Sequence, residues 1–216
     1  MVMLASCAGR QREYSVTERL DQFGPVVAER LTPAFAAARL GYPPHNLAIL
    51  AFKDTSIIEI YAMNKDDAAW TFVKRYPVLA ASGHLGPKLT EGDRQVPEGV
   101  YEIQWLNPNS REHLSLMLDY PNAFDELVAQ REGRTHLGNN IMIHGGASSI
   151  GCLAIGDEAA EDLFILAALS TSAHIRVLVS PTDFRVGEHA ALPRDPAWVE
   201  DLYDRLRVEL RQYPRQ

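Results

Sequence analysis

The sequence is poor in cysteine, in positive charge and in long apolar runs. Only Cys7 and Cys152 occur among the 216 residues, which excludes a fold held together by a disulfide framework. The 21 lysines and arginines are outnumbered by 28 acidic residues, and the net charge of −7 argues against charge-driven binding to nucleic acid or to an anionic membrane surface. No stretch approaches the roughly 18 uninterrupted apolar residues of a membrane-spanning helix. The apolar content of 46% is enough for one core, formed by a single domain with small appendages.

Cys7 closes the string Met3-Leu4-Ala5-Ser6-Cys7, which resembles the lipobox of a bacterial lipoprotein signal, where the cysteine becomes lipidated. Only six residues precede it, whereas a signal needs an apolar stretch of about 7 to 15 residues. Residues 1–14 are therefore interpreted as a clipped signal or tether, with lipidation of Cys7 and a chance match both open. A lipidated or removed Cys7 would leave Cys152 as the lone thiol.

Residues 15–43 are predicted to be helical and to precede the main domain. Apolar residues recur at helical spacing, and Gly24-Pro25 and Thr32-Pro33 are expected to divide the segment into separate helical pieces, because proline removes a donor and clashes inside a helix. Pro43 and Pro44 mark the boundary to the main domain. We expect that domain over 44–182, followed by a connector and an amphipathic helix over 183–216.

The main domain is predicted to be mainly β. Short β-prone runs are separated by turn-forming residues such as Asn107-Pro108-Asn109-Ser110. The expected strands are Leu47–Phe52, Ser56–Tyr61, Trp70–Leu79, Gly99–Leu106, His113–Leu118, Asn140–His144 and Ile175–Val179.

Two helices are expected after Cys152. One begins with Asp157 as N-cap and runs through Leu169, where it covers the sheet. The other lies within 195–213, with Pro196 in its first turn and apolar residues one turn apart. The fold class is therefore mainly β (α+β): a β-sandwich with a covering helix plus N- and C-terminal helices.

A histidine and a thiol share one glycine-rich loop, from Ile141 to Cys152. Free cysteine is only about 3% thiolate at pH 7, so a nucleophilic cysteine needs a neighbouring base, which His144 supplies. Glycines at 145, 146 and 151 let the loop turn tightly and expose N–H groups for the oxyanion of an acyl-transfer reaction. On the alternative interpretation, Cys152 is a small buried hydrophobe and His144 only ends a strand.

The residues around this loop resemble the L,D-transpeptidase (YkuD-type) catalytic domain family. The family's histidine-glycine and serine-x-glycine-cysteine are matched by His144-Gly145 and Ser149-Ile150-Gly151-Cys152. Upstream, the stretch from Gly92 to Tyr101 resembles the family's glycine-aspartate-x-x-x-proline-x-glycine-x-tyrosine segment. Leu118 to Asn122 and Ser149 to Asp157 resemble the YafK branch in particular.

The resemblance implies that Cys152 attacks the carbonyl of the L-centre of diaminopimelate in a peptidoglycan stem peptide and forms a thioester. His144 would act as general base and then as general acid, oriented by the backbone carbonyl of Gly145. The backbone amides of Gly151 and Cys152 would hold the oxyanion. Such chemistry requires no cofactor and no metal.

Further roles at the rim are implied in the same way. Ser149, beside Ile150, would shape the loop or touch substrate. Arg94, next to Asp93, lies in a turn-rich segment whose family counterpart flanks the cleft, and a solvated turn is the alternative. Tyr120 is implied as a second substrate contact.

Ile150 and the interval from His144 to Cys152 depart from the usual family pattern. Ile150 stands where most members have histidine, and the interval is shorter than usual, as in the YafK branch. Members of that branch are linked to hydrolysing the amide between peptidoglycan and a covalently attached lipoprotein. The resemblance therefore implies this hydrolysis, with transpeptidation that forms diaminopimelate cross-links or attaches proteins as the alternative.

Two other classes of function stay open. The first is a non-catalytic peptidoglycan-binding module, and the second a metal-dependent hydrolase using His84, His113 and His136, although none of these has a two-histidine ligand spacing. The expected partners are peptidoglycan stem peptides and a peptidoglycan-linked outer-membrane lipoprotein, with membrane contact only through a lipid on Cys7. The substrate implies a periplasmic location.

Overall fold

The structure is a computed structural model, and it describes residues 12–172, 174–192 and 195–215. Cys7, the predicted lipidation site, lies outside these residues. Within them, no helix has the length and apolarity needed to cross a membrane.

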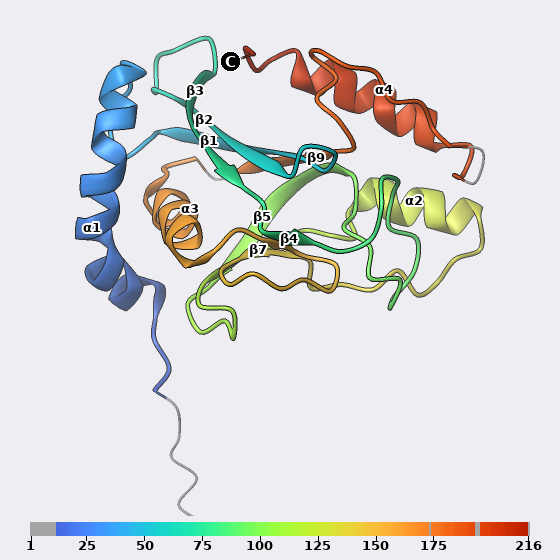
Figure 1. Cartoon of the computed structure of the whole chain (residues 1–216), viewed down its shortest axis with the longest axis horizontal. Coiled ribbons are helices and arrows are strands. Elements are labelled where there is room, and N and C mark those ends of the chain that lie inside the picture. The colour runs from blue at the N-terminus through green and yellow to red at the C-terminus, as the bar shows by residue number, and fades with distance from the viewer. Residues whose placement is uncertain (1–11, 173, 193–194, 216) are drawn as a thin grey trace, which may run out of the picture.

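One curled sheet forms the centre of the described part of the chain, with helices on both of its faces (Figure 1). The strand order is β3-β2-β1-β9-β5-β6-β7-β8-β4. The strands are β1 Asn46–Phe52, β2 Ile57–Met63, β3 Thr71–Pro77, β4 Ala80–Ala81, β5 Gly99–Asn107, β6 Ser115–Leu118, β7 Met142–His144, β8 Leu153–Ala154 and β9 Arg176–Ser180. The helices are α1 Val16–Ala37, α2 Ala123–Arg131, α3 Asp157–Leu169 and α4 Val199–Leu210. The predicted mainly β class is confirmed.

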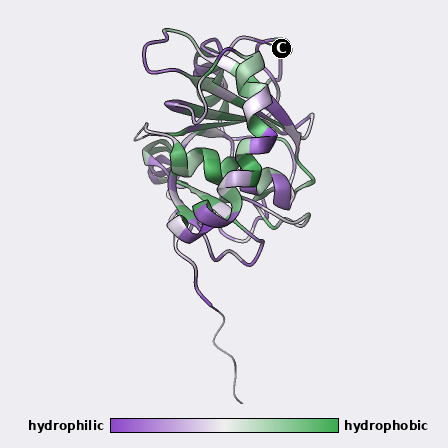
Figure 2. Ribbon diagram, turned by 90° about the vertical axis from the view of Figure 1, so that its left-hand side faces the viewer, coloured by the Kyte–Doolittle hydropathy of each residue, from purple (hydrophilic) through white to green (hydrophobic). Residues whose placement is uncertain are grey.

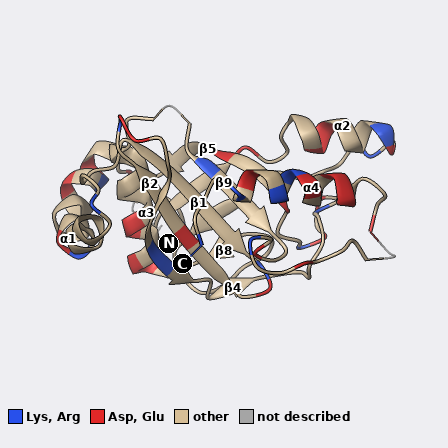
Figure 3. Cartoon of the chain, turned by 90° about the horizontal axis from the view of Figure 1, so that it is seen from above, with Lys and Arg blue, Asp and Glu red and all other residues tan. Residues whose placement is uncertain are grey.

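Strand β1 is apolar from Leu47 to Phe52 because both of its faces are covered. Leu47 and Ile49 join the main core, to which α1 and α3 contribute. Ala48 and Leu50 point to the opposite face and join a second core that includes Tyr213 from the end of the chain. A continuous apolar run is what a strand buried on both faces requires. Apolar residues accordingly gather at the centre of the molecule (Figure 2), and charged residues lie largely on the helices and outer loops (Figure 3).

Helix α1 is continuous, so the prediction of separate helical pieces is wrong. Pro25 and Pro33 both lie inside the helix, and both are exposed. Each proline leaves the carbonyl four residues earlier without its helical partner. Those carbonyls belong to Asp21 and Glu29, which are also exposed, so water can satisfy them. The prolines therefore cost the helix little on this side.

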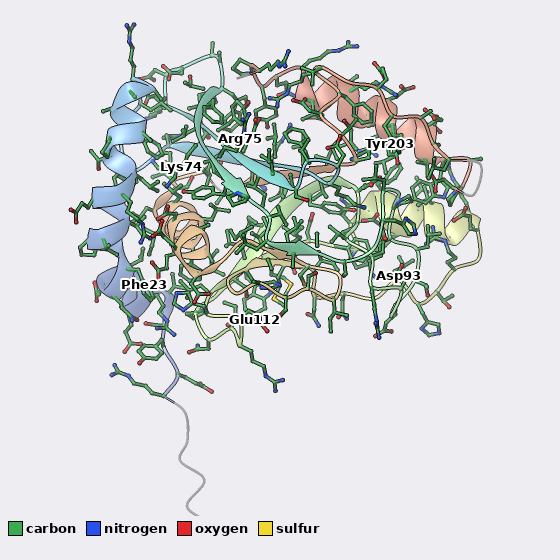
Figure 4. All side chains as sticks on the ribbon, in the orientation of Figure 1. Phe23, Lys74, Arg75, Asp93, Glu112 and Tyr203 are labelled. Atoms are coloured by element: carbon green, nitrogen blue, oxygen red, sulfur yellow. The ribbon has the colours of Figure 1, made fainter. Side chains whose placement is uncertain are left out.

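A buried carboxylate on α3 joins α1 and β3. Asp162 has no exposed surface; it accepts hydrogen bonds from Arg30 Nε at 2.9 Å and from the Tyr76 hydroxyl at 2.7 Å. Lys74 lies 3.3 Å away on the same strand as Tyr76. Figure 4 shows Lys74 on the side of β3 that faces α1. The N-terminal helix is thus packed against the main sheet and its covering helix.

Several helix boundaries differ from the prediction. Gly156 is the N-cap of α3, and Asp157 is its first residue, with its carboxylate accepting the Gly146 amide at 2.8 Å instead of capping the helix. Helix α4 begins only at Val199, because Pro196 lies in a preceding turn where its carbonyl accepts the Val199 amide. Helix α2 was not expected. Its capping box of Asn122 and Asp125 is the signal that sequence analysis missed.

Candidate active site

The predicted histidine and cysteine lie at the ends of two adjacent strands. Strands β7 and β8 pair in parallel, with His144 opposite Ala154. Cys152 directly precedes β8, two residues before Ala154, and the alternation of side chains along the strand, continued to Cys152, would put it on the face of the sheet that carries His144. The short loop 145–152 connects the two strands where a parallel pair usually needs a longer crossover. Gly146 and Gly151 make this turn with φ values of 68° and 107°, a region that favours glycine.

His144 is buried and held in one orientation. Its Nδ1 lies 2.7 Å from the carbonyl oxygen of Gly145, and since a carbonyl only accepts, Nδ1 carries the hydrogen. The Nε2 atom of the neutral ring is then an acceptor and can take a proton. The contact predicted for Gly145 is therefore present. The catalytic role of His144 stays a prediction.

The Cys152 thiol is half-buried, and its surroundings favour the protonated form. Its Sγ donates to the carbonyl of Asn140 across 3.7 Å. Burial raises the pKa of the Cys152 thiol above its usual value, and the carboxylate of Glu112 adds to this effect; a backbone hydrogen bond at Met142 and the ammonium of Lys88 act in the opposite direction. Attack by the thiol therefore requires a base to remove its proton.

Glu112 approaches the turn that follows His144. A Cβ atom on Gly146 would lie 2.8 Å from the Glu112 Oε2 atom, and one on Gly145 would lie 2.7 Å from its backbone carbonyl. Figure 4 shows Glu112 on the loop before β6, below β7 in that view. Sequence analysis did not single out this residue, because its position depends on packing between loops far apart in the chain.

The two backbone N–H groups that were predicted to hold the oxyanion each donate a hydrogen bond to a serine hydroxyl. The Gly151 N–H donates to Ser82 Oγ at 2.6 Å, and the Cys152 N–H donates to Ser149 Oγ at 3.0 Å. Ser149 also donates to the Cys152 carbonyl at 2.6 Å, which is the loop-shaping contact foreseen for it. Ile150, at the tip of the loop, is 79% exposed. In this arrangement each N–H group already donates to a serine hydroxyl. To bind the oxyanion it must either share its hydrogen between the two acceptors or give up the bond to the serine.

The segment before β5 is held together by Asp93. Burial alone would raise the pKa of Asp93, but hydrogen bonds from Lys88 and from backbone amides, including those of Thr90 and Gln95, bring it below its usual value. Figure 4 shows Asp93 in the loops away from α1. Arg94 is exposed, with a φ of 56°, and its carbonyl accepts the Ser82 hydroxyl at 2.7 Å. Asp93 thus has an organising role here, while the substrate contact expected of Arg94 stays a prediction.

Tyr120 is buried, with its hydroxyl and its ring both in contact with other residues of the protein. It is 4% exposed, and its hydroxyl donates to the Leu137 carbonyl at 3.1 Å. Its ring packs edge-to-face against Tyr101, with centroids 6.1 Å apart. The hydroxyl is therefore engaged within the protein instead of facing a substrate.

A cavity of about 530 Å³, which could not be predicted from the sequence, lies at the end of α2. It is formed by the end of α2, the segment 133–139 and Glu91, and Arg134, His136 and Asn139 are part of its lining. Asn139 directly precedes Asn140, whose carbonyl accepts the Cys152 thiol. One lining residue of the cavity is therefore the chain neighbour of the residue that the predicted nucleophile contacts.

Two of the three histidines weighed as metal ligands, His113 and His84, have other side-chain contacts. His113 Nε2 lies 2.9 Å from Glu161 Oε1, and the ring packs edge-to-face against Phe23. His84 Nδ1 lies 2.7 Å from the Leu85 carbonyl. Over residues 12–172, 174–192 and 195–215, no three His, Cys, Asp or Glu side chains are grouped to hold a metal ion.

The fold and the site together define a class of protein with a histidine and a cysteine on adjacent strands of a curled sheet. The family model of the YkuD L,D-transpeptidase catalytic domain matches residues 49–179, more than half of the chain. The protein belongs to this family.

Particular relatives are similar over part of their length. The putative L,D-transpeptidase YafK of Escherichia coli K12 is 32% identical over 118 residues, which are 54% of this chain and 45% of that protein, and the same figures hold for YafK of strain O157:H7. The chain thus spans about half the length of the curated relatives it matches. A crystal structure of a mutant of the helical cell shape determining protein Pgp2 from Campylobacter jejuni is 23% identical, with a TM-score of 0.50 over 66% of this chain and 49% of that one. This last likeness shows the fold alone.

Proposed function

We propose that this protein is a cysteine acyl-transfer enzyme acting on peptidoglycan stem peptides at diaminopimelate, and that it hydrolyses the amide joining a lipoprotein to peptidoglycan. Membership of the L,D-transpeptidase family and the similarity to YafK support an enzyme of this kind. The observation that carries the proposal is the placement of His144 and Cys152 on the parallel pair β7–β8, with Nδ1 of the histidine tied to the Gly145 carbonyl.

The first half of the reaction forms a thioester. Nε2 of His144 takes the proton from the Cys152 thiol as Sγ attacks the amide carbonyl, because the raised pKa of the thiol leaves little thiolate at neutral pH. The tetrahedral intermediate then collapses. The C–N bond breaks, and the amine leaves with the proton that His144 had taken.

The second half releases the acyl group to water. His144, neutral again, takes a proton from a water molecule that attacks the thioester carbonyl. The C–S bond breaks, the carboxylic acid leaves and His144 returns the proton to Sγ. An amine in place of water would give the transpeptidation product, so the choice between the two activities depends on which acceptor reaches the thioester.

We place part of the donor peptide in the cavity formed by α2, the segment 133–139 and Glu91. The lining of the cavity includes Asn139, the chain neighbour of Asn140, and this supports a path for the bound peptide toward the thiol of Cys152. Its lining combines the carboxylates of Glu91 and Glu126 with the guanidinium of Arg134. These charges match a peptide that carries both free ammonium and carboxylate groups.

Muropeptide mass spectrometry tests the proposal. Sacculi with and without bound lipoprotein are incubated with the protein or with its Cys152→Ala variant, then digested. Release of lipoprotein only with the intact thiol supports the hydrolase, and new diaminopimelate cross-links would instead identify a transpeptidase. No change with either folded protein would contradict the proposed chemistry and favour a binding module.

We also propose that the protein acts in the periplasm, where its substrate lies, with a lipid on Cys7 as a membrane anchor. The lipobox-like string at residues 3–7 supports this proposal. Globomycin treatment of cells that produce the natural full-length protein, followed by fractionation and mass analysis of the N-terminal peptide, tests it. An unmodified Cys7 in the mature protein would contradict the anchor.

A further inference from the structure

Ser82 is the cross-strand neighbour of the predicted nucleophile. Strands β4 and β8 pair antiparallel, with Ala81 opposite Leu153, and continuing this register by one residue brings Ser82 opposite Cys152. The Ser82 hydroxyl accepts the Gly151 N–H at 2.6 Å and donates to the Arg94 carbonyl at 2.7 Å. One side chain thereby connects the residue before the nucleophile to the segment that precedes β5.

The position of Ser82 is itself fixed by a buried glutamine. Gln95 is 4% exposed; its Nε2 donates to the carbonyls of His84 and Gly86, and its Oε1 accepts the His84 amide. Gly83, with a φ of 95°, lies so close that a Cβ there would be 2.1 Å from Gln95 Oε1. The chain from Ser82 to Gly86 is therefore wrapped tightly around the glutamine, which leaves Ser82 little freedom.

The backbone of Gly151 needs a hydrogen bond to hold it in one conformation. Its φ of 107° is a conformation that glycine adopts among several others at similar cost, so the residue alone does not fix the direction of the chain entering Cys152. The hydrogen bond to Ser82 selects one orientation of the Gly151 amide. Ser149 then fixes the next peptide group through its two contacts with Cys152.

We propose that Ser82 is a positioning residue for the nucleophile, an inference that rests on the proposed acyl-transfer function. Its hydroxyl holds Gly151 so that Cys152, directly before β8, keeps Sγ directed toward His144 at the end of the neighbouring β7. Without this hydrogen bond, the loop samples other conformations and the thiol spends less time in line with the substrate carbonyl. The Gly151 amide then serves the geometry of the loop through Ser82.

Shape-matched variants separate this role from a purely structural one. Ser82→Thr keeps a hydroxyl, Ser82→Val has the same shape without it, and Ser82→Ala removes the group. Ser170→Ala is the control, because the Ser170 hydroxyl donates a single hydrogen bond, to the His45 carbonyl at 3.0 Å, away from the loop 145–152. The thermal midpoint, kcat and KM for lipoprotein release, and the rate of Cys152 alkylation by iodoacetamide are measured on the full chain. Alkylation is quantified on the Cys152 peptide so that Cys7 does not contribute.

We expect Ser82→Ala and Ser82→Val to lower kcat by about 10- to 100-fold while KM changes less than about threefold, since misplacement of a reacting group has an effect of this size. The same two variants should alkylate at least about twofold faster, because a freed loop exposes the thiol. Ser82→Thr should restore both values, and Ser170→Ala should leave both unchanged.

Two results would overturn the proposal: a kcat in Ser82→Ala and Ser82→Val equal to that of Ser170→Ala, or a fall in kcat that Ser82→Thr does not rescue. Should one of the two hydroxyl-free variants fail to fold, the other decides. Alkylation needs no substrate, so it remains informative if the wild-type protein releases no lipoprotein. In that case the proposed function fails. Alkylation at the wild-type rate in the hydroxyl-free variants would separately contradict the positioning role of Ser82.

Discussion

The hydroxyl of Ser149 holds both peptide groups of Cys152, accepting its N–H at 3.0 Å and donating to its carbonyl at 2.6 Å. These two contacts fix the backbone of the predicted nucleophile while its side chain stays half-buried. With the backbone of Cys152 held in place, the reactivity of its thiol depends on the neighbouring charges and on solvent. The effect of one neighbouring charge on the pKa of the thiol can therefore be measured with a single substitution.

Replacing Glu112 by glutamine should make the Cys152 thiol more acidic. Burial and the negative charge of Glu112 both raise the pKa of Cys152, and Glu112→Gln removes the second cause. The midpoint of the pH dependence of alkylation should therefore move to lower pH, and the rate at pH 8 should rise about twofold or more. Iodoacetamide kinetics on the Cys152 peptide measure both quantities.

The control for this change is Glu13→Gln, which removes the same charge from an exposed residue near the start of α1. It should leave the alkylation midpoint where it is in the wild-type protein. An alkylation profile of Glu112→Gln that is unchanged, or shifted to higher pH, would show that Glu112 does not act on the thiol.

Asp125 should make the protein less stable as pH rises from about 4 to about 6. Burial raises the pKa of Asp125 to about 6 in the folded state, against about 3.9 in an unfolded chain. The folded state therefore binds more protons between these two values, and stability falls as pH rises through them and is constant above. The gap corresponds to about 3 kcal/mol.

Urea unfolding of the wild-type protein and of Asp125→Asn at pH 4 and pH 7 measures this contribution. The variant keeps an oxygen that can accept the Asn122 amide but carries no titrating proton. Its free energy of unfolding should fall less between the two pH values than that of the wild type. Equal changes in both proteins would mean that Asp125 titrates normally.

Removing the Asp162 carboxylate should destabilise the protein by about 3 kcal/mol and loosen α1 in particular. Asp162→Ala leaves Arg30, Lys74 and Tyr76 without their shared buried acceptor, and breaking a buried pair is costly. Chemical denaturation gives the free energy, and limited proteolysis reports whether cleavage within α1 becomes faster. Asp204→Ala, which breaks an exposed pair with Arg207, should change neither measurement appreciably. Cleavage of Asp162→Ala at the wild-type rate would contradict the role given to this carboxylate.

Much of the fold could be predicted from local patterns. The apolar runs of β1 and α3 and the amphipathic spacing of α4 could be recognised, because burial on both sides of an element leaves a continuous apolar run and burial on one side leaves a periodic one. Helix α2 gave no such signal, since only Val128 and Ala129 of its residues are buried. The continuity of α1 through Pro25 and Pro33 depends on which side of the helix faces water, and the spacing of residues alone does not state this.

Some residues of the candidate site could likewise be predicted from the sequence, and others could not. His144 and Cys152 could be proposed from their place in one glycine-rich loop, and the role of Gly145 from the resemblance to the family. The contacts of Ser82 and Glu112 could not, because they depend on the pairing of β4 with β8 and on the approach of one loop to another. Tyr120 shows the converse: a residue implied as a substrate contact is buried, with its hydroxyl bound to the Leu137 carbonyl.

The most direct test of the central claim, a thioester on Cys152, is mass analysis of the protein after brief mixing with lipoprotein-bearing muropeptides and acid quench. We expect an acyl adduct on the Cys152 peptide that hydroxylamine removes and that is absent from Cys152→Ala. In His144→Ala the adduct should form at least about 100-fold more slowly, because the thiol then lacks its base. Turnover without an adduct, or turnover retained in Cys152→Ala, would contradict the claim.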